Sequence, residues 1–174
     1  IDCHIGSQLT ETQPFVDALD RVIVMIDQLK TMGIQLKHID IGGGLGVTYK
    51  DEVPPTVFEY ANAMKPALEK LGLKVYMEPG RSISANAGVL LTKVDLLKPT
   101  IHRNFAIIDA AMNDLIRPAL YEAWMDIQPV TPRSDVEAKE WDVVGAICET
   151  GDFVGKERVR ARKENDVQVV LGAG

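Results

Sequence analysis

The feature that most constrains the fold is a regular alternation, over the first 87 residues, of short apolar segments with longer amphipathic ones. Apolar residues recur at helical spacing in Thr12–Met32, and Gly33 follows directly, as is typical of a helix end. A second helix is expected over Thr56–Leu71, where Pro66 is expected to kink or split it. Short apolar segments that predict strands flank these helices: Ile1–Cys3, Leu36–Ile41 and Leu73–Gly80.

Strands that alternate with helices predict a parallel α/β sheet or barrel. After Ala87 the pattern changes to short β-rich segments divided by turns, with no helix expected among them. We therefore predict an α/β part at residues 1–87 and an all-β part at residues 88–174. A (β/α)₈ TIM barrel needs about 250 residues, so the α/β part is expected to be the last βα units of such a barrel, with its N-terminal units missing. A small open α/β sheet is the alternative.

Composition excludes several classes of function. With 46% hydrophobic residues, 25% charged residues and a net charge of −6, the chain has an ordinary globular composition and lacks the cationic excess that nucleic-acid binding needs. The one basic cluster, Gly155–Lys163, is expected to be a solvated face, the alternative being an RNA-binding patch. Cys3 and Cys148 show no zinc spacing, so no metal site is expected and a reducing cytoplasm is the expected location. No apolar run is long enough to cross a membrane.

Polar and flexible residues gather at the three predicted strand ends, which parallel strands bring to one edge. The run Gly42–Gly44 offers backbone N–H groups to an anion, although a plain tight turn explains it equally well. In YMEPGRS, Glu78 and Arg81 add a carboxylate and a guanidinium, and in CHIGSQ, His4 adds a flat ring. A ring for stacking, a phosphate cradle and a carboxylate for a ring nitrogen together indicate pyridoxal phosphate.

Five motifs then carry a resemblance to a known family. HIGSQ, GGGLG, EPGR, MNDLIRPALY and CETGD occur in the order and approximate spacing found in the diaminopimelate decarboxylases, a family of alanine-racemase-like, fold-type III pyridoxal-phosphate enzymes. The resemblance implies a TIM barrel followed by a β-sandwich or barrel-like C-terminal domain, whose end is expected to be truncated here. It also implies a homodimer with active sites shared across the interface.

The resemblance implies roles for particular residues. His4 would stack on the cofactor ring, Glu78 would pair with the pyridine nitrogen, and Cys148, from the opposite subunit, would assist reprotonation of the carbanion, which makes His4 and Cys148 the catalytic pair. The implied cofactor-binding residues are His4, Ser7, Gly43, Gly44, Glu78, Gly80 and Arg81. The implied substrate-binding residues are Arg81, Arg117, Tyr121 and Glu149.

The activity implied is the decarboxylation of meso-2,6-diaminoheptanedioate to L-lysine and CO2, the last step of lysine biosynthesis. An ornithine- or arginine-type decarboxylase of the same fold is the second reading, because its substrate has no distal carboxylate for Arg117 to bind. A non-catalytic homologue that binds partners is the third. The family's Schiff-base lysine lies on the first barrel strand and has no matching motif here, so the 174 residues alone are expected to be inactive.

Overall fold

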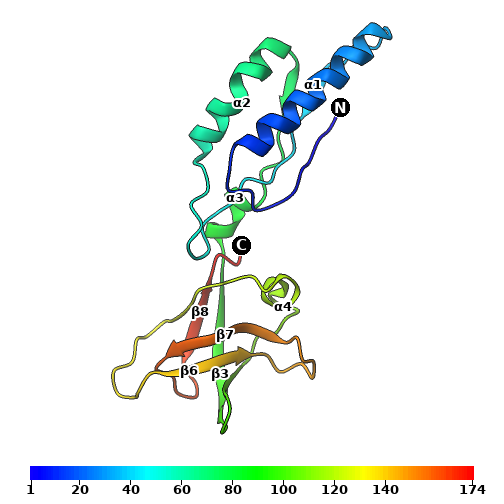
Figure 1. Ribbon diagram of the computed structural model, residues 1–174. Coiled ribbons are helices and arrows are strands. Elements are labelled where there is room, and N and C mark those ends of the chain that lie inside the picture. The colour runs from blue at the N-terminus through cyan, green and yellow to red at the C-terminus, as the bar shows by residue number, and fades with distance from the viewer. The chain divides into compact units, whose positions relative to one another are not determined.

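The computed structural model describes residues 1–174, which form two compact units, Ile1–Ala85 and Asn86–Gly174. Figure 1 shows the chain coloured from its N-terminus to its C-terminus. No helix in it combines the length and the apolar character needed to cross a membrane.

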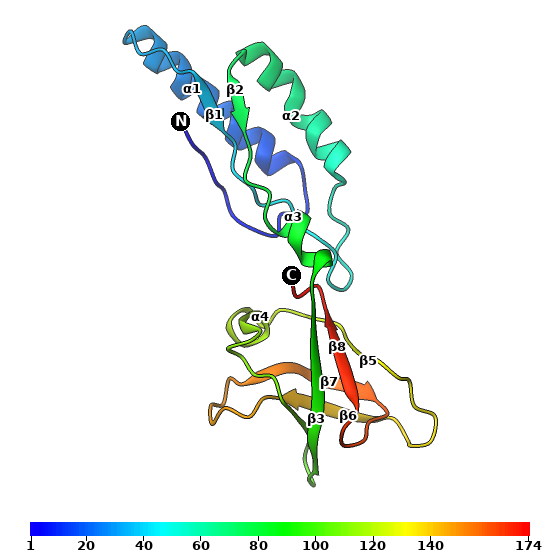
Figure 2. The same ribbon diagram turned by 180° about the vertical axis from the view of Figure 1, so that it is seen from behind.

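In the first unit, parallel segments lie side by side in chain order. Strand β1 (His38–Asp40) pairs in parallel with β2 (Lys74–Tyr76), as Figure 2 shows, and Asp2 forms a parallel bridge to Asp40. Segments that are successive in the chain are therefore neighbours in space. This confirms the parallel arrangement that the alternation of strands and helices predicted.

Helices α1 (Gln13–Thr31) and α2 (Val57–Leu71) pack against these strands and against each other (Figure 1). Both predicted helices are confirmed to within one residue at each end. The core between these elements consists of buried side chains, at helical spacing in α1 and α2 and at alternate positions in and directly after β1. They are Phe15, Leu19, Ile26, Ile39, Ile41, Tyr60 and Met64. Burial of such a set is the main contribution that stabilises this unit.

Of the two effects expected of Pro66, a kink or a split, the structure contradicts the split: one helix runs from Val57 to Leu71. Pro66 lies on the exposed side of the helix, where water can satisfy the carbonyl that loses its hydrogen bond. Both helix ends are also well formed. Thr56 Oγ1 accepts a hydrogen bond from Glu59 N–H at 3.2 Å, the Thr56 N–H donates to Glu59 Oε2 at 2.8 Å, and Gly72 ends the helix in the left-handed conformation.

The second unit is built on a six-stranded sheet in the order β5-β8-β3-β4-β6-β7. All neighbouring strands are antiparallel except β4 and β6, which are parallel. The first half of the long strand β3 pairs with β8 and its second half with β4, so β3 joins the two halves of the sheet. The strands are β3 (Val89–Pro99), β4 (Asn104–Ile108), β5 (Ile127–Pro129), β6 (Lys139–Val144), β7 (Phe153–Arg160) and β8 (Val167–Leu171).

Two expectations for this unit were wrong. A helix, α4 (Ile116–Tyr121), forms within it, with Pro118 in its first turn, where a proline has no hydrogen bond to lose. The basic cluster is not a solvated face, because it contains most of β7 and buries Arg158 and Arg162, which are 7% and 3% exposed. The centre of the Trp124 ring lies 3.2 Å from the Arg158 guanidinium carbon, and Arg162 Nη1 donates to Gln168 Oε1 at 2.9 Å. Burial lowers the pKa of each of the two guanidinium groups to about 10.

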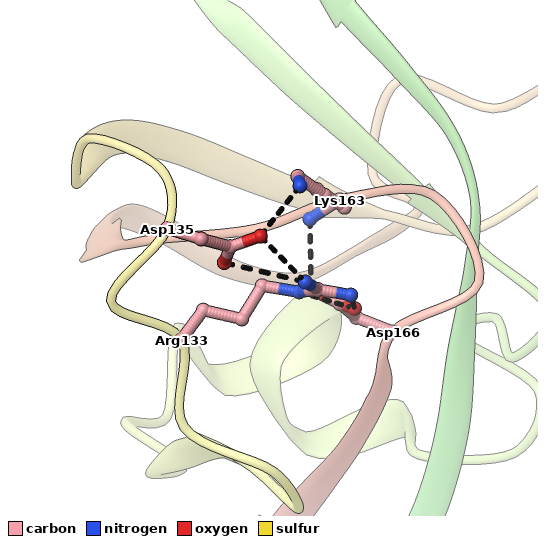
Figure 3. A network of polar contacts seen from close by, with 4 residues as sticks. All are labelled: Arg133, Asp135, Lys163 and Asp166. Atoms are coloured by element: carbon pink, nitrogen blue, oxygen red, sulfur yellow. Dashed lines mark hydrogen bonds and ion pairs between the residues drawn. The ribbon is translucent and has the colours of Figure 1, made fainter.

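An ion-pair network ties the loop before β6 to the turn before β8 (Figure 3). Arg133 lies at its centre: its Nε donates to Asp166 Oδ1 at 2.8 Å and its Nη1 lies 3.2 Å from Asp135 Oδ2. Lys163 Nζ reaches the same Asp135 oxygen at 2.6 Å. Hydrogen bonds from Lys163 and Arg133 hold the pKa of Asp135 below its ordinary value. At Asp166 burial raises the pKa, but hydrogen bonds from Arg133 and from the Lys163 N–H outweigh it, so the pKa is lowered there too.

We expect this network to make the free energy of unfolding depend on pH in the acidic range. A depressed carboxylate pKa stabilises the folded state above the ordinary value of 3.8 and loses that contribution as the pH falls through the folded-state pKa. Arg133→Met should therefore lower the free energy of unfolding at pH 7, and the difference from the wild type should shrink below about pH 4. Urea unfolding at a series of pH values measures this. A difference that does not change with pH would show that the network contributes packing and not charge.

Candidate active site

The three strand ends of the first unit lie next to one another. Cys3 and Ile41 line the helix-side core, and Met77 lines a pocket against α2. His4, the glycine turn and Glu78 follow along these neighbouring segments, and the side chains of His4 and Glu78 are exposed. The predicted ring, glycine turn and carboxylate therefore come together at one edge.

Backbone contacts hold these three strand ends at close range. The Gly43 N–H donates to His4 Nδ1 at 3.4 Å, and the Glu78 N–H donates to the Gly42 carbonyl at 2.9 Å. The acceptor role of Nδ1 assigns the proton of the neutral ring to Nε2. His4 and Glu78 thus flank the glycine turn from either side.

The glycines are required by this close approach. A Cβ on Gly43 would overlap the carbonyl oxygen of Glu78, and one on Gly44, whose φ is +106°, would overlap the carbonyl oxygen of Gly6. The N–H groups of Gly42 and Gly43 already donate, to Asp40 Oδ1 at 2.9 Å and to His4 Nδ1 at 3.4 Å, so two of the three N–H groups of the run have partners within the chain. A cavity of about 280 Å³ borders the turn and is lined by Gly42, Gly43, Gly44, Leu45, Val57, Tyr60, Met77, Pro79, Ser82 and Ile83.

Arg81 opens the short helix α3 (Arg81–Ser84) directly after Gly80. Its Nη1 donates to Gln8 Oε1 at 3.0 Å, and its guanidinium carbon lies 5.6 Å from the centre of the Tyr49 ring. The cation is half-buried and held beside the glycine turn. Ser7 lies exposed in the loop between His4 and Gln8.

These residues fit pyridoxal phosphate. The group needs a flat partner for its ring, a carboxylate for its pyridine nitrogen and a close, cationic surround for its phosphate. His4 and Glu78 offer the first two, and Arg81 offers a cation for the third.

The second unit contains the other predicted residues. The Arg117 guanidinium carbon lies 5.8 Å from the centre of the Tyr121 ring, both on α4, and Tyr121 is 66% exposed. Cys148 and Glu149 are exposed in the loop that joins β6 to β7. The first unit thus contains one set of the predicted residues and the second unit contains the other.

A buried carboxylate joins the two loops of the second set. Asp152, 4% exposed, accepts the Met112 N–H at its Oδ1 and the Ile147 N–H at its Oδ2, each at 2.7 Å. A Cβ on Gly145 would overlap Oδ2, so that glycine is needed for the carboxylate to fit. One side chain therefore holds the loop before α4 against the loop that contains Cys148.

Asp152→Asn is expected to lower the free energy of unfolding by about 2 kcal/mol, because an amide nitrogen would face one of the two N–H donors and leave it unsatisfied in a buried place. Urea denaturation measures the effect. Asp114→Asn is the matched control, since Asp114 accepts the Ala111 N–H at 2.9 Å from an exposed position in the same loop. Equal losses in the two variants would contradict the clamp.

Sequence reasoning assigned no role to Gln8 or Asp152. Both stand inside motifs that were singled out, HIGSQ and CETGD, so their position was a signal. Their function depends on partners such as Val47 and Met112, which lie 39 and 40 residues away in the chain, and the motifs do not contain these partners.

Comparison with known proteins identifies the class. Residues 1–85 match the family model of the pyridoxal-binding domain of pyridoxal-dependent decarboxylases. The first unit is thus similar to the pyridoxal-binding domain of this family, and it has the fold of the N-terminal domain of fold-type III decarboxylases.

Over its whole length the chain is similar to diaminopimelate decarboxylases. The enzyme of that name from Vibrio cholerae is 58% identical over 175 residues, covering 100% of this chain and 42% of the relative. A crystal structure from Aquifex aeolicus matches all of the chain and 43% of its own, with a TM-score of 0.94 and 41% identity. Diaminopimelate decarboxylase of Helicobacter pylori, complexed with L-lysine, matches 99% of the chain and 43% of its own, with a TM-score of 0.90 and 37% identity. The chain thus spans well under half the length of these relatives.

Proposed function

We propose that these residues form part of an enzyme that decarboxylates meso-2,6-diaminoheptanedioate to L-lysine and CO2. In this proposal residues 1–87 are the last βα units of a pyridoxal-phosphate-binding barrel, and residues 88–174 belong to a β-sandwich or barrel-like domain. The observation that carries the proposal is the identity of 58% along the whole chain to an enzyme of that name, in a chain whose strand ends fit the cofactor.

Pyridoxal phosphate, when bound, supplies an electron sink for the pair of electrons that remains on the substrate when CO2 leaves. His4 would stack on the ring, and the Glu78 carboxylate would keep the pyridine nitrogen protonated. Arg81 would offer its cation to an anionic group. Ser7, Gly43, Gly44 and Gly80 would surround the phosphate or lie beside it, and the exposure of Ser7 and Gly80 supports this.

The second unit would provide substrate recognition. Diaminoheptanedioate carries an amino-acid group at each end, so a selective pocket needs a cation for the distal carboxylate and an anion for its ammonium group. Arg117 and Glu149 would supply these charges, with Tyr121 beside Arg117. Cys148 would deliver a proton to the carbon that loses CO2.

The motif CETGD also bears on assembly. By its resemblance to the family, Cys148 and Glu149 would act in the active site of the opposite subunit, so we propose a homodimer in which each active site is shared. Both residues lie in an exposed loop, and the clamp by Asp152 gives that loop a defined shape, which supports a role at an interface.

The proposal is tested by release of CO2 from meso-diaminoheptanedioate, ornithine and arginine, in parallel and with added pyridoxal phosphate. The complete enzyme for this experiment is either the natural polypeptide that contains this segment or the Vibrio cholerae relative with its matching residues replaced by residues 1–174. Turnover of diaminoheptanedioate alone supports the proposal. Turnover of ornithine or arginine would point to the other decarboxylase class, and no turnover would point to a partner-binding homologue.

Arg117→Ala tests the specificity argument in the same enzyme. Loss of a charge-assisted hydrogen bond to the distal carboxylate should lower kcat/KM for diaminoheptanedioate about 30-fold. Steady-state kinetics measure it, with Arg21→Ala on the exposed face of α1 as the control. An unchanged kcat/KM would remove Arg117 from the substrate site.

A further inference from the structure

Gln8 has an unusual backbone conformation for a residue other than glycine. Its φ is 60°, in the left-handed region, which costs free energy for a side chain of this size. Two backbone hydrogen bonds on the next residue hold the loop in place: the Leu9 N–H donates to the Gly44 carbonyl and the Gly46 N–H donates to the Leu9 carbonyl, each at 2.9 Å. Strain that is held in this way beside a site indicates a function for the side chain.

The amide of Gln8 pairs with the backbone as a strand would. Its Nε2 donates to the Val47 carbonyl at 2.6 Å, and its Oε1 accepts the Val47 N–H at 3.1 Å. The pairing fixes which end of the amide is oxygen, since only one orientation satisfies both groups of Val47. Gly46 leaves room for it, because a Cβ there would lie 3.3 Å from Oε1.

The same oxygen also accepts a hydrogen bond from Arg81 Nη1 at 3.0 Å. A single amide therefore connects all three strand-end loops of the first unit: its own, the loop of Val47 and the loop of Arg81. A neutral acceptor directs the guanidinium without adding a negative charge that would weaken its attraction for an anion. The Tyr49 ring, 5.6 Å away, adds a second neutral neighbour.

We infer that Gln8 is a positioning residue that holds the guanidinium of Arg81 toward an anionic group of the bound molecules. The inference deepens the proposed function and rests on it. The anion is the phosphate of the cofactor or a carboxylate of the substrate, which share the same chemistry, and the experiment below separates them.

A double-mutant cycle in the complete enzyme tests this coupling. Gln8→Gly removes the amide and also relieves the strained φ, so it is the variant best able to keep the fold. It is combined with Arg81→Met. The dissociation constant of pyridoxal phosphate for the apoenzyme, KM for diaminoheptanedioate and kcat are measured for all four proteins. An effect of Arg81→Met on the dissociation constant identifies the phosphate as the anion, and an effect on KM identifies the substrate carboxylate.

Gln8→Gly should raise the same constant that Arg81→Met raises, either the dissociation constant of pyridoxal phosphate or KM. The expected increase is about tenfold, which corresponds to one charge-assisted hydrogen bond. In the Arg81→Met background it should change that quantity less than twofold. Equal effects in the two backgrounds would overturn the inference, and so would an Arg81→Met variant with unchanged cofactor affinity and KM.

Asn165→Gly is the matched control. Asn165 also has a positive φ, 67°, but it lies in a turn of the second unit. Its replacement by glycine relieves backbone strain in the same way and should leave all three quantities unchanged. A wild-type enzyme that binds pyridoxal phosphate but releases no CO2 would overturn the proposed function. The cycle on the dissociation constant would still decide the inference, because it requires no turnover.

Discussion

Glu78→Gln is expected to slow the decarboxylation of diaminoheptanedioate by the complete enzyme about 10³-fold, because a neutral amide no longer favours the protonated pyridine nitrogen. Without that proton the ring is a poorer acceptor for the electrons left by CO2. The variant should still bind pyridoxal phosphate, since Glu78 is expected to contact the ring and not the phosphate. The measurement is kcat together with a cofactor titration.

Glu69→Gln is the control for this substitution. Glu69 is an exposed carboxylate on α2, 3.5 Å from Lys65 Nζ, and its loss should leave kcat unchanged. A Glu78→Gln enzyme within twofold of the wild-type rate would remove Glu78 from its assigned role. Loss of cofactor binding without a loss of rate at saturating cofactor would instead place Glu78 near the phosphate.

Gly43→Ala should lower the free energy of unfolding of the chain by about 3 kcal/mol, as expected when a close contact is overfilled. The new methyl group would overlap the Glu78 carbonyl oxygen. That carbonyl belongs to a backbone segment tied to Gly42 by a hydrogen bond of 2.9 Å, so it cannot move aside like the end of a flexible side chain. The strand ends would have to separate, and the proposed cofactor site would separate with them.

Urea denaturation measures the loss, and cofactor titration of the complete enzyme should show weaker binding of pyridoxal phosphate. Gly151→Ala is the matched control, because a Cβ at Gly151 meets nothing within 4 Å and its φ is not positive, so its stability should change little. If the two alanine variants were equally stable, the strand ends would not be as closely packed as the structure shows.

Much of the fold could be predicted from local patterns. The ends of α1 and α2 follow from signals within one helical turn, such as Thr56 with Glu59 and the glycine at position 72. The parallel order of the strands follows from the alternation of strands and helices. Glu78 and His4 could be singled out because each lies at the end of a predicted strand. The roles of these residues in the chemistry stay predictions.

The two buried arginines of the basic cluster, Arg158 and Arg162, show where prediction from the local sequence pattern fails. Their charge in the sequence indicated a solvated face, but Arg158 is buried because Trp124, 34 residues earlier, stacks on it and the Met125 carbonyl accepts a hydrogen bond from its Nη2 at 3.0 Å. Nothing near position 158 in the chain carries that information. The helix α4 was also not predicted, because the segments around it in the chain are rich in strands. Pro118 does not prevent it, since the proline lies in the first turn of the helix.

The sequence by itself thus determined the helices of the first unit, the order of its strands and the motifs at their ends, because periodicity, caps and turns act over a few residues. Only the tertiary structure decided that Gln8 joins three loops, that Asp152 clamps two others and that two arginines are buried. Each of these depends on groups brought together from distant parts of the chain, where a hydrogen bond of 2.6 to 3.1 Å or the exclusion of water decides the outcome.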